Sequence, residues 1–67
     1  MEYLVILEFG SNNWSAYVPD LPGCVAVAET REETLELMKD AIQGHLEVMR
    51  MNGEEIPQPS QSALVKV

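Results

Sequence analysis

The chain has 67 residues, with 11 acidic and 4 basic side chains and a formal net charge of -7 at neutral pH. This charge repels phosphate groups, so it disfavours direct binding to nucleic acid or to an anionic membrane surface. With one cysteine and one histidine, the chain offers neither an intramolecular disulfide nor a zinc ligand set, and we expect no cofactor. Its length predicts a single domain over residues 1–67, too small to be very stable without support from another subunit.

The N-terminus does not resemble a secretion signal. Glu2 stands where a basic segment would be expected, and the apolar run at 3–7 is too short for a signal peptide or a membrane span. The sequence therefore predicts a cytoplasmic protein.

Residues 1–9 are predicted to form the first strand. Apolar side chains fall on both of its faces, with Val5 and Leu7 on one and Leu4 and Ile6 on the other. The segment Gly-Ser-Asn-Asn at 10–13 favours a hairpin to a second strand at 14–18.

A loop rich in proline at 19–23, the central loop, separates the second strand from a third at 24–28. Pro19 cannot donate to a sheet, and Pro22 followed by Gly23 suits the centre of a type II turn. We therefore predict two antiparallel strands joined by this loop.

A helix is predicted from Arg31 to about Asn52, with Gly53 in its C-cap region. The sequence Thr-Arg-Glu-Glu at 30–33 has capping-box spacing, in which the Thr30 hydroxyl bonds the Glu33 amide and the Glu33 carboxylate returns to the Thr30 amide. The face expected to cover the sheet carries Leu35, Met38, Ile42, His45, Leu46 and Met49. A second apolar strip lies beside it and consists of Leu37, Ala41, Gly44, Val48 and Met51.

Residues 54–60 include two prolines and predict an extended connection to a last strand at 62–67. A right-handed crossover would place this strand parallel to the first and beside it. The predicted fold class is therefore α+β, with β-β-β-α-β order, a mixed four-stranded sheet of order 3-2-1-4 and one helix on one face.

One helix covers only one face of such a sheet. We therefore expect the opposite face, with Leu4 and Ile6, or the second helix strip to be buried in a homo-oligomer, a dimer or a tetramer. The predicted interface residues are Leu4, Ile6, Leu37, Ala41, Gly44, Val48 and Met51.

Catalytic groups are scarce in this sequence. The element order is that in which a ribonuclease H domain begins, but the segment 62–67 offers no acid for two-metal catalysis. Cys24 and His45 lie on different predicted elements, without a third group to orient a base. We therefore predict a non-enzymatic protein with no catalytic, cofactor-binding or metal-binding residues.

Four short segments, in this order along the chain, are more specific evidence than composition. They are WSAYVPDLPGC at 14–24, AETREETL at 28–35, AIQGHL at 41–46 and IPQPS at 56–60. Together they resemble the HicB-type antitoxin family. The resemblance implies a degraded, partial ribonuclease H-like fold without nuclease activity, in a short form that lacks the C-terminal DNA-binding domain of many members.

The resemblance also implies a partner, a small basic mRNA-cleaving toxin that is a HicA-like ribonuclease of a type II toxin–antitoxin pair. Candidate residues for steering it are acids near the central loop and the helix start, Asp20, Glu29, Glu32 and Glu33. The alternative is an orphan HicB-like oligomeric interaction module whose partner is not a nuclease.

Overall fold

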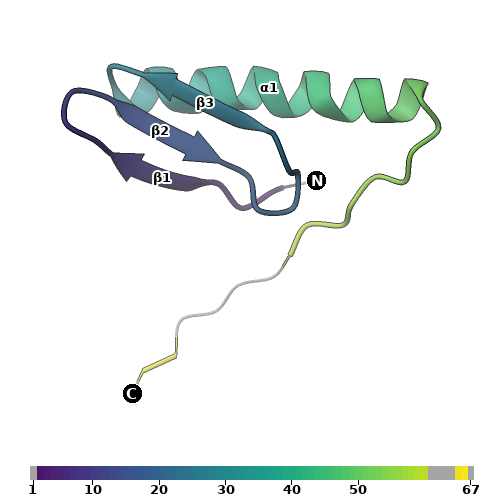
Figure 1. The fold of residues 1–67 in the computed structure, drawn as a ribbon. Coiled ribbons are helices and arrows are strands. Elements are labelled where there is room, and N and C mark those ends of the chain that lie inside the picture. Colours follow the sequence, from purple (N-terminus) through teal and green to yellow (C-terminus); the bar gives the residue numbers. More distant parts are fainter. Residues whose placement is uncertain (1, 61–64, 67) are drawn as a thin grey trace.

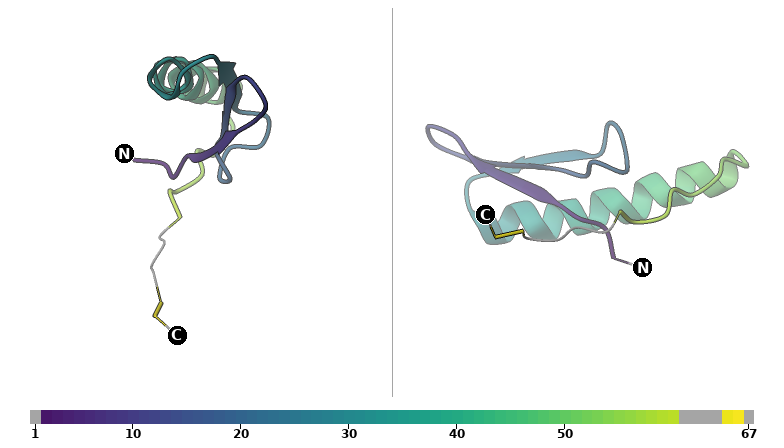
Figure 2. Two further views of the ribbon diagram at one scale, coloured as in Figure 1. Left: turned by 90° about the vertical axis from the view of Figure 1, so that its left-hand side faces the viewer. Right: turned by 90° about the horizontal axis from the view of Figure 1, so that it is seen from below.

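The computed structural model describes residues 2–60, 65 and 66 and has three antiparallel strands followed by one helix (Figure 1). The elements are β1 (Ile6–Phe9), β2 (Trp14–Tyr17), β3 (Val25–Ala28) and α1 (Arg31–Met51). The strands lie in the order β1-β2-β3, and α1 covers one face of the sheet (Figure 2). The α+β class, the three antiparallel strands and the single helix are thus confirmed.

The first strand is shorter than the predicted 1–9. Its register begins at Ile6 opposite Tyr17, and after Tyr17 the chain turns away into the proline-rich loop. Residues 2–5 therefore have no β2 residue opposite them.

The predicted strand at 62–67 falls mainly on residues 61–64 and 67, which lie outside the described part of the chain. Val65 and Lys66 belong to no strand, and Val65 is 80% exposed. The sheet formed by the described residues therefore has three strands, and a fourth is not among them.

Both predicted turns are present. The Gly10 amide donates to the Asn13 carbonyl at 2.8 Å, which closes the hairpin between β1 and β2. In the second turn, the Cys24 amide donates to the Leu21 carbonyl at 3.0 Å, and Gly23 has φ = 85°. This bond and the positive φ at the third turn position match a type II turn, as the Pro22-Gly23 pair predicted.

The core lies between the inner face of the sheet and α1. Its buried apolar residues come from β2, the central loop and the helix, and are Ala16, Val18, Leu21, Cys24 and Met38. Partly buried Leu35 and Ile42 lie on the predicted helix face, with Met38 between them. Two fully buried residues were not predicted, Leu21 in the loop and Thr34 in α1. The Thr34 hydroxyl donates to the Thr30 carbonyl at 2.7 Å, which satisfies its polar group inside the protein.

The helix ends are capped largely as predicted. The Glu33 amide donates to the Thr30 hydroxyl at 3.1 Å, but the Glu33 carboxylate accepts from that hydroxyl at 3.1 Å and not from the Thr30 amide. The predicted capping box is therefore half formed. At the other end, the Gly53 and Glu54 amides donate to the Arg50 and Met49 carbonyls, which is the bond pattern of a Schellman motif.

Apolar side chains remain on the outer face of the sheet, as predicted. Tyr17, Val25 and Val27 are 42%, 62% and 56% exposed, and Leu4 is 39% exposed. On the second helix strip, Leu37, Val48 and Met51 are exposed, whereas Ala41 is half-buried against the core. A single copy therefore leaves two apolar surfaces in contact with solvent.

Two glycines should respond oppositely to alanine. Gly23→Ala places a side chain at positive φ and should lower the free energy of unfolding by about 1–2 kcal/mol. Gly44→Ala meets open space in the middle of α1 and should raise it by about 1 kcal/mol. Urea unfolding followed by Trp14 fluorescence measures both, and a change of the same sign in the two variants would contradict the assigned backbone conformations.

Candidate functional site

The candidate acidic residues occupy two separate places. Glu29, Glu32 and Glu33 surround the start of α1 and are exposed. Asp20 lies in the loop before β3, at the opposite end of that strand (Figure 1). A four-residue strand spans about 13 Å, so the three glutamates form one acidic surface and Asp20 lies apart from it.

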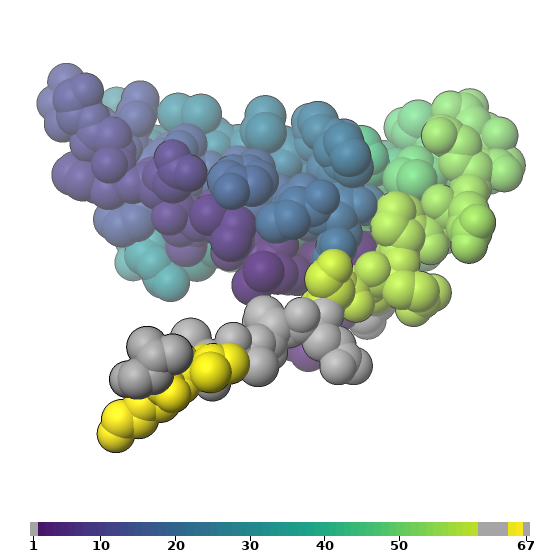
Figure 3. All heavy atoms as spheres, turned by 60° about the horizontal axis from the view of Figure 1, so that its bottom comes forward, coloured from purple at the N-terminus to yellow at the C-terminus, as the bar shows by residue number. Residues whose placement is uncertain are grey.

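Asp20 holds the chain that follows the helix. The Ser60 amide donates to its Oδ2 at 2.7 Å, and the Ser60 hydroxyl donates to its Oδ1. These two hydrogen bonds lower the pKa of Asp20 below its usual value. The bond from the Ser60 hydroxyl has the larger effect, and the bond from the Ser60 amide comes second. The Tyr3 hydroxyl donates to the Pro57 carbonyl, so the segment 54–60 lies back against the domain (Figure 3).

The sequence did not predict these contacts between the segment 54–60 and the rest of the domain. Asp20 and Ser60 are 40 residues apart, and Tyr3 and Pro57 are 54 apart. Neither pair belongs to a local motif, so no spacing rule connects them. The sequence predicted only that the two prolines would make this segment extended, and it forms no helix or strand.

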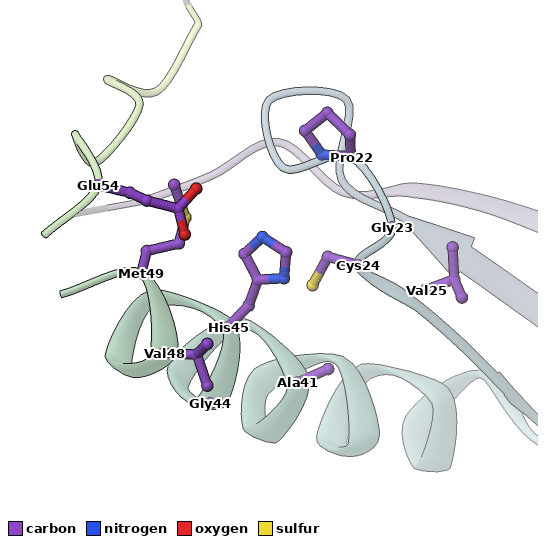
Figure 4. A pocket seen from close by; sticks show the side chains of 10 residues that line it. All are labelled: Pro22, Gly23, Cys24, Val25, Ala41, Gly44, His45, Val48, Met49 and Glu54. Atoms are coloured by element: carbon purple, nitrogen blue, oxygen red, sulfur yellow. The ribbon is translucent and has the colours of Figure 1, made fainter. Parts of the chain in front are cut away.

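A groove of about 580 Å³ separates the start of β3 from the second half of α1 (Figure 4). The loop and strand contribute Pro22, Gly23, Cys24 and Val25 to its walls, and the helix and its end contribute Ala41, Gly44, His45, Val48, Met49 and Glu54. Figure 4 shows the His45 ring on the helix directed across the groove toward the loop that carries Pro22 and Cys24. The fold thus brings Cys24 and His45 to one groove, although their positions in the sequence gave no reason to expect this.

The chemistry of Cys24 is that of a core residue. Its side chain is only 3% exposed, and its thiol donates to the Met38 sulfur at 3.9 Å. Burial raises the pKa of the Cys24 thiol, which disfavours the thiolate needed for nucleophilic attack. The groove is therefore better suited to contact with a partner than to covalent catalysis.

The described residues contain neither a cluster of metal ligands nor a helix that could cross a membrane. Residues 2–60, 65 and 66 contain no group of three or more His, Cys, Asp or Glu placed to bind a metal ion. In the same part of the chain, α1 has 21 residues but is not apolar enough to cross a membrane.

The predicted interface residues lie on two surfaces. Leu4 and half-buried Ile6 belong to the outer side of the sheet at β1. Leu37, Gly44, Val48 and Met51 are exposed on α1, where Gly44 and Val48 also line the groove. The remaining member, Ala41, packs partly against the core.

Taken together, the fold and the site define a small acidic α+β domain with exposed apolar surfaces. Residues 3–66 match the family model described as the HicB_like antitoxin of bacterial toxin–antitoxin systems. The chain belongs to the HicB-like antitoxin family.

Individual relatives agree with this assignment. The chain is 33% identical over 60 residues to Antitoxin HicB 2 of Photorhabdus laumondii, covering 90% of this chain and 43% of the relative. It is 34% identical over 58 residues to the UPF0150 protein Ta0767 of Thermoplasma acidophilum, covering 85% and 84%.

A third relative is an uncharacterized 14.9 kDa protein in the rep-hol intergenic region of Haemophilus phage HP1. It is 35% identical over 57 residues, covering 85% of this chain and 43% of the relative. The chain thus spans less than half the length of the phage and Photorhabdus relatives, but most of the Thermoplasma protein.

The Asp20 contact should depend on pH. Hydrogen bonds to the carboxylate depress its pKa below about 3.9, so the contact is complete above that value and weakens as the pH falls through the lower, folded-state pKa. Asp20→Asn should weaken the contact at neutral pH and remove its pH dependence. The measurement is the Ser60 amide resonance in NMR, with Asp40→Asn on the exposed helix face as the control, and a Ser60 resonance unaffected by Asp20→Asn at neutral pH would contradict the contact.

Proposed function

We propose that this protein is a non-catalytic antitoxin that binds and neutralises a small basic mRNA-cleaving toxin, a HicA-like ribonuclease, in a type II toxin–antitoxin pair. The observation that carries the proposal is the family match over residues 3–66, nearly the whole chain. Neutralisation here means that the antitoxin covers the catalytic surface of the toxin.

The charge of the chain supports a basic partner. A net charge of -7 on 67 residues attracts a cationic protein and speeds its association. Glu29, Glu32 and Glu33 are exposed together at the start of α1, and we propose this surface as the one that steers the toxin. We propose Asp20 as a second contact with the toxin, separate from this surface. Its carboxylate also accepts a hydrogen bond from the Ser60 amide.

The proposal of a non-enzymatic role has support from the two candidate catalytic residues. The Cys24 thiol has a raised pKa and donates to Met38, in the groove that it shares with His45. The groove provides apolar contact surface around these two residues, with Val48 and Ala41 on its helix wall.

We further propose that residues 1–67 form one cytoplasmic HicB-like domain and that the segment 62–67 adds a fourth strand beside β1. This would give the sheet order 3-2-1-4 of a partial ribonuclease H-like fold. A hollow of about 350 Å³ on this side of the helix, lined by Tyr3, Val5 and Ile42 among others, supports an additional element near β1.

The exposed apolar surfaces support a homo-oligomer, a dimer or a tetramer. Burying apolar surface stabilises by roughly 25 cal/mol per Å², and this is the gain available to a domain too small for a large core of its own. The proposed interface draws on Leu4 and Ile6 of the sheet and on the helix strip, Leu37, Ala41, Gly44, Val48 and Met51.

The test of the antitoxin function uses the product of the reading frame adjacent to this gene. We expect that product to be a small basic protein that arrests growth when expressed alone, and that growth resumes when this chain is co-expressed. The two proteins should then co-purify. An adjacent product that is neither basic nor toxic would contradict the proposal and favour the orphan interaction module.

The steering surface should respond to charge reversal. Glu29→Lys with Glu32→Lys should slow association with the basic partner by about tenfold at low salt and reduce the salt dependence of the rate. The matched control is Asp40→Lys with Glu47→Lys, which changes the net charge equally on exposed positions farther along α1. Stopped-flow association rates that fall equally in both variants would show that net charge, and not this surface, steers the partner.

A further inference from the structure

Strand β3 lies at the edge of the sheet. The order β1-β2-β3 places β2 on one side of β3, and the described residues provide no strand for its other side (Figure 1). The proposed fourth strand would lie beside β1 and would leave this edge of β3 as it is. An edge strand presents unpaired amide and carbonyl groups, which another strand can bind.

The ladder with β2 determines which backbone groups point outward. The Val18 amide donates to the Cys24 carbonyl at 3.2 Å, so the backbone of Cys24 faces β2. In an antiparallel ladder the direction alternates, which turns the backbone groups of Val25 and Val27 to the outer edge. These are two positions at the spacing that an antiparallel strand requires.

This edge is short but carries neither of the side-chain types that usually protect an edge strand, charged residues and proline. Natural edge strands carry lysine, proline, a bulge or a covering element, whereas residues 24–28, Cys-Val-Ala-Val-Ala, contain no charge and no proline. The side chains of Val25 and Val27 are 62% and 56% exposed. Such an edge is typical of a strand that is paired in the assembled protein.

We propose that β3 pairs antiparallel with β3 of a second copy of this chain, Val25 opposite the second copy's Val27 and Ala26 opposite its Ala26. This inference rests on the proposed homo-oligomer and specifies its contact. The pairing is isologous, so one two-fold axis relates the copies. It gives a continuous sheet of six strands with both helices on one face, because paired residues of adjacent strands share a face.

The composition of this edge suits a second copy better than the basic partner. Two copies with a charge of -7 each repel one another, and an uncharged surface such as residues 21–28 opposes their contact least. A basic protein would find no acidic side chain among these residues to pair with. The register also places Glu29 opposite the second copy's Gly23, so Glu29 does not face its own symmetry mate.

The groove extends the same contact. It begins at Cys24 and Val25, and its helix wall carries Val48, which is 55% exposed. The proposed register brings the end of the second copy's β3 beside Cys24, at the mouth of this groove. Gly44 offers open space on the helix wall, so the second copy can come close there.

The decisive test introduces charges at the two outward positions. In the variant V25K/V27K, lysines of the two copies oppose each other, and the dissociation constant of the dimer should rise by about tenfold or more in sedimentation equilibrium. In V25K/V27E, a lysine opposes a glutamate, and the dissociation constant should return to within about threefold of the unchanged protein. The matched control is S11K/Q43K, which adds the same charge at two exposed positions outside β3 and the groove.

Three results would overturn the proposal. In the first, V25K/V27K dimerises as tightly as the unchanged protein. In the second, V25K/V27K and V25K/V27E lose the same amount of dimer affinity. In the third, only L37K loses the dimer, which would assign the contact to the helix strip. Circular dichroism of each variant checks that it is folded.

Hydrogen exchange tests the same contact without a variant. The Val25 and Val27 amides should become protected as the concentration of the unchanged protein is raised through the dimerisation range. Exchange that stays fast while the protein dimerises would overturn the β3 contact alone. A monomer at all concentrations would overturn the homo-oligomer as well, whereas toxin neutralisation is tested separately by the growth assay.

Discussion

The packing of the central loop against the helix is the interaction on which the rest of the structure depends. Leu21 is fully buried although it lies in a loop, and it shares the core with Met38 of α1. Its amide donates to the Val18 carbonyl and its carbonyl accepts from the Cys24 amide, so the loop satisfies its own backbone while it buries Leu21. This arrangement sets the position of β3 relative to β2 and holds the sheet on the helix.

The same arrangement explains why the chain exposes apolar surface. With one helix over one face, burial of Ala16 and Cys24 on the inner side leaves Tyr17 and Val25 on the outer side, because alternate residues of a strand point to opposite faces. A second layer in the same chain would cover them, but the described residues provide none. These exposed side chains are the basis of the proposed contacts with other chains, and the antitoxin family implies a toxin partner.

Acidic and apolar surfaces occupy different parts of the molecule. Three exposed glutamates, Glu29, Glu32 and Glu33, lie at the start of α1, whereas residues 21–28 of the central loop and β3 are uncharged. A basic toxin and a second copy of an acidic chain have opposite electrostatic requirements, so one molecule can bind both through different surfaces. Asp20 lies apart from the glutamates at the helix start, and its carboxylate binds Ser60.

Much of the fold followed from local rules. The Pro22-Gly23 turn, the Thr30 cap, the helix face around Met38 and the C-cap at Gly53 each depend on residues within a few positions of one another, and each was predicted from spacing. Predictions that depended on distant neighbours were less accurate. The first strand was predicted too long because its length depends on where β2 ends.

The candidate site divides in the same way. Asp20, Glu29, Glu32 and Glu33 were predicted as one set of acids near the central loop and the helix start, and the last three are exposed at that start. The separation of Asp20 from them, its bond to Ser60 and the groove shared by Cys24 and His45 could not be predicted, since they join residues from different elements.

The sequence by itself determined the acidic charge, the order of strands and helix, and the family, because composition and short motifs carry these properties. The tertiary structure alone decided which side chains meet across the groove and that Asp20 binds Ser60. Those features arise from the packing of elements distant in the chain, and no local spacing encodes them.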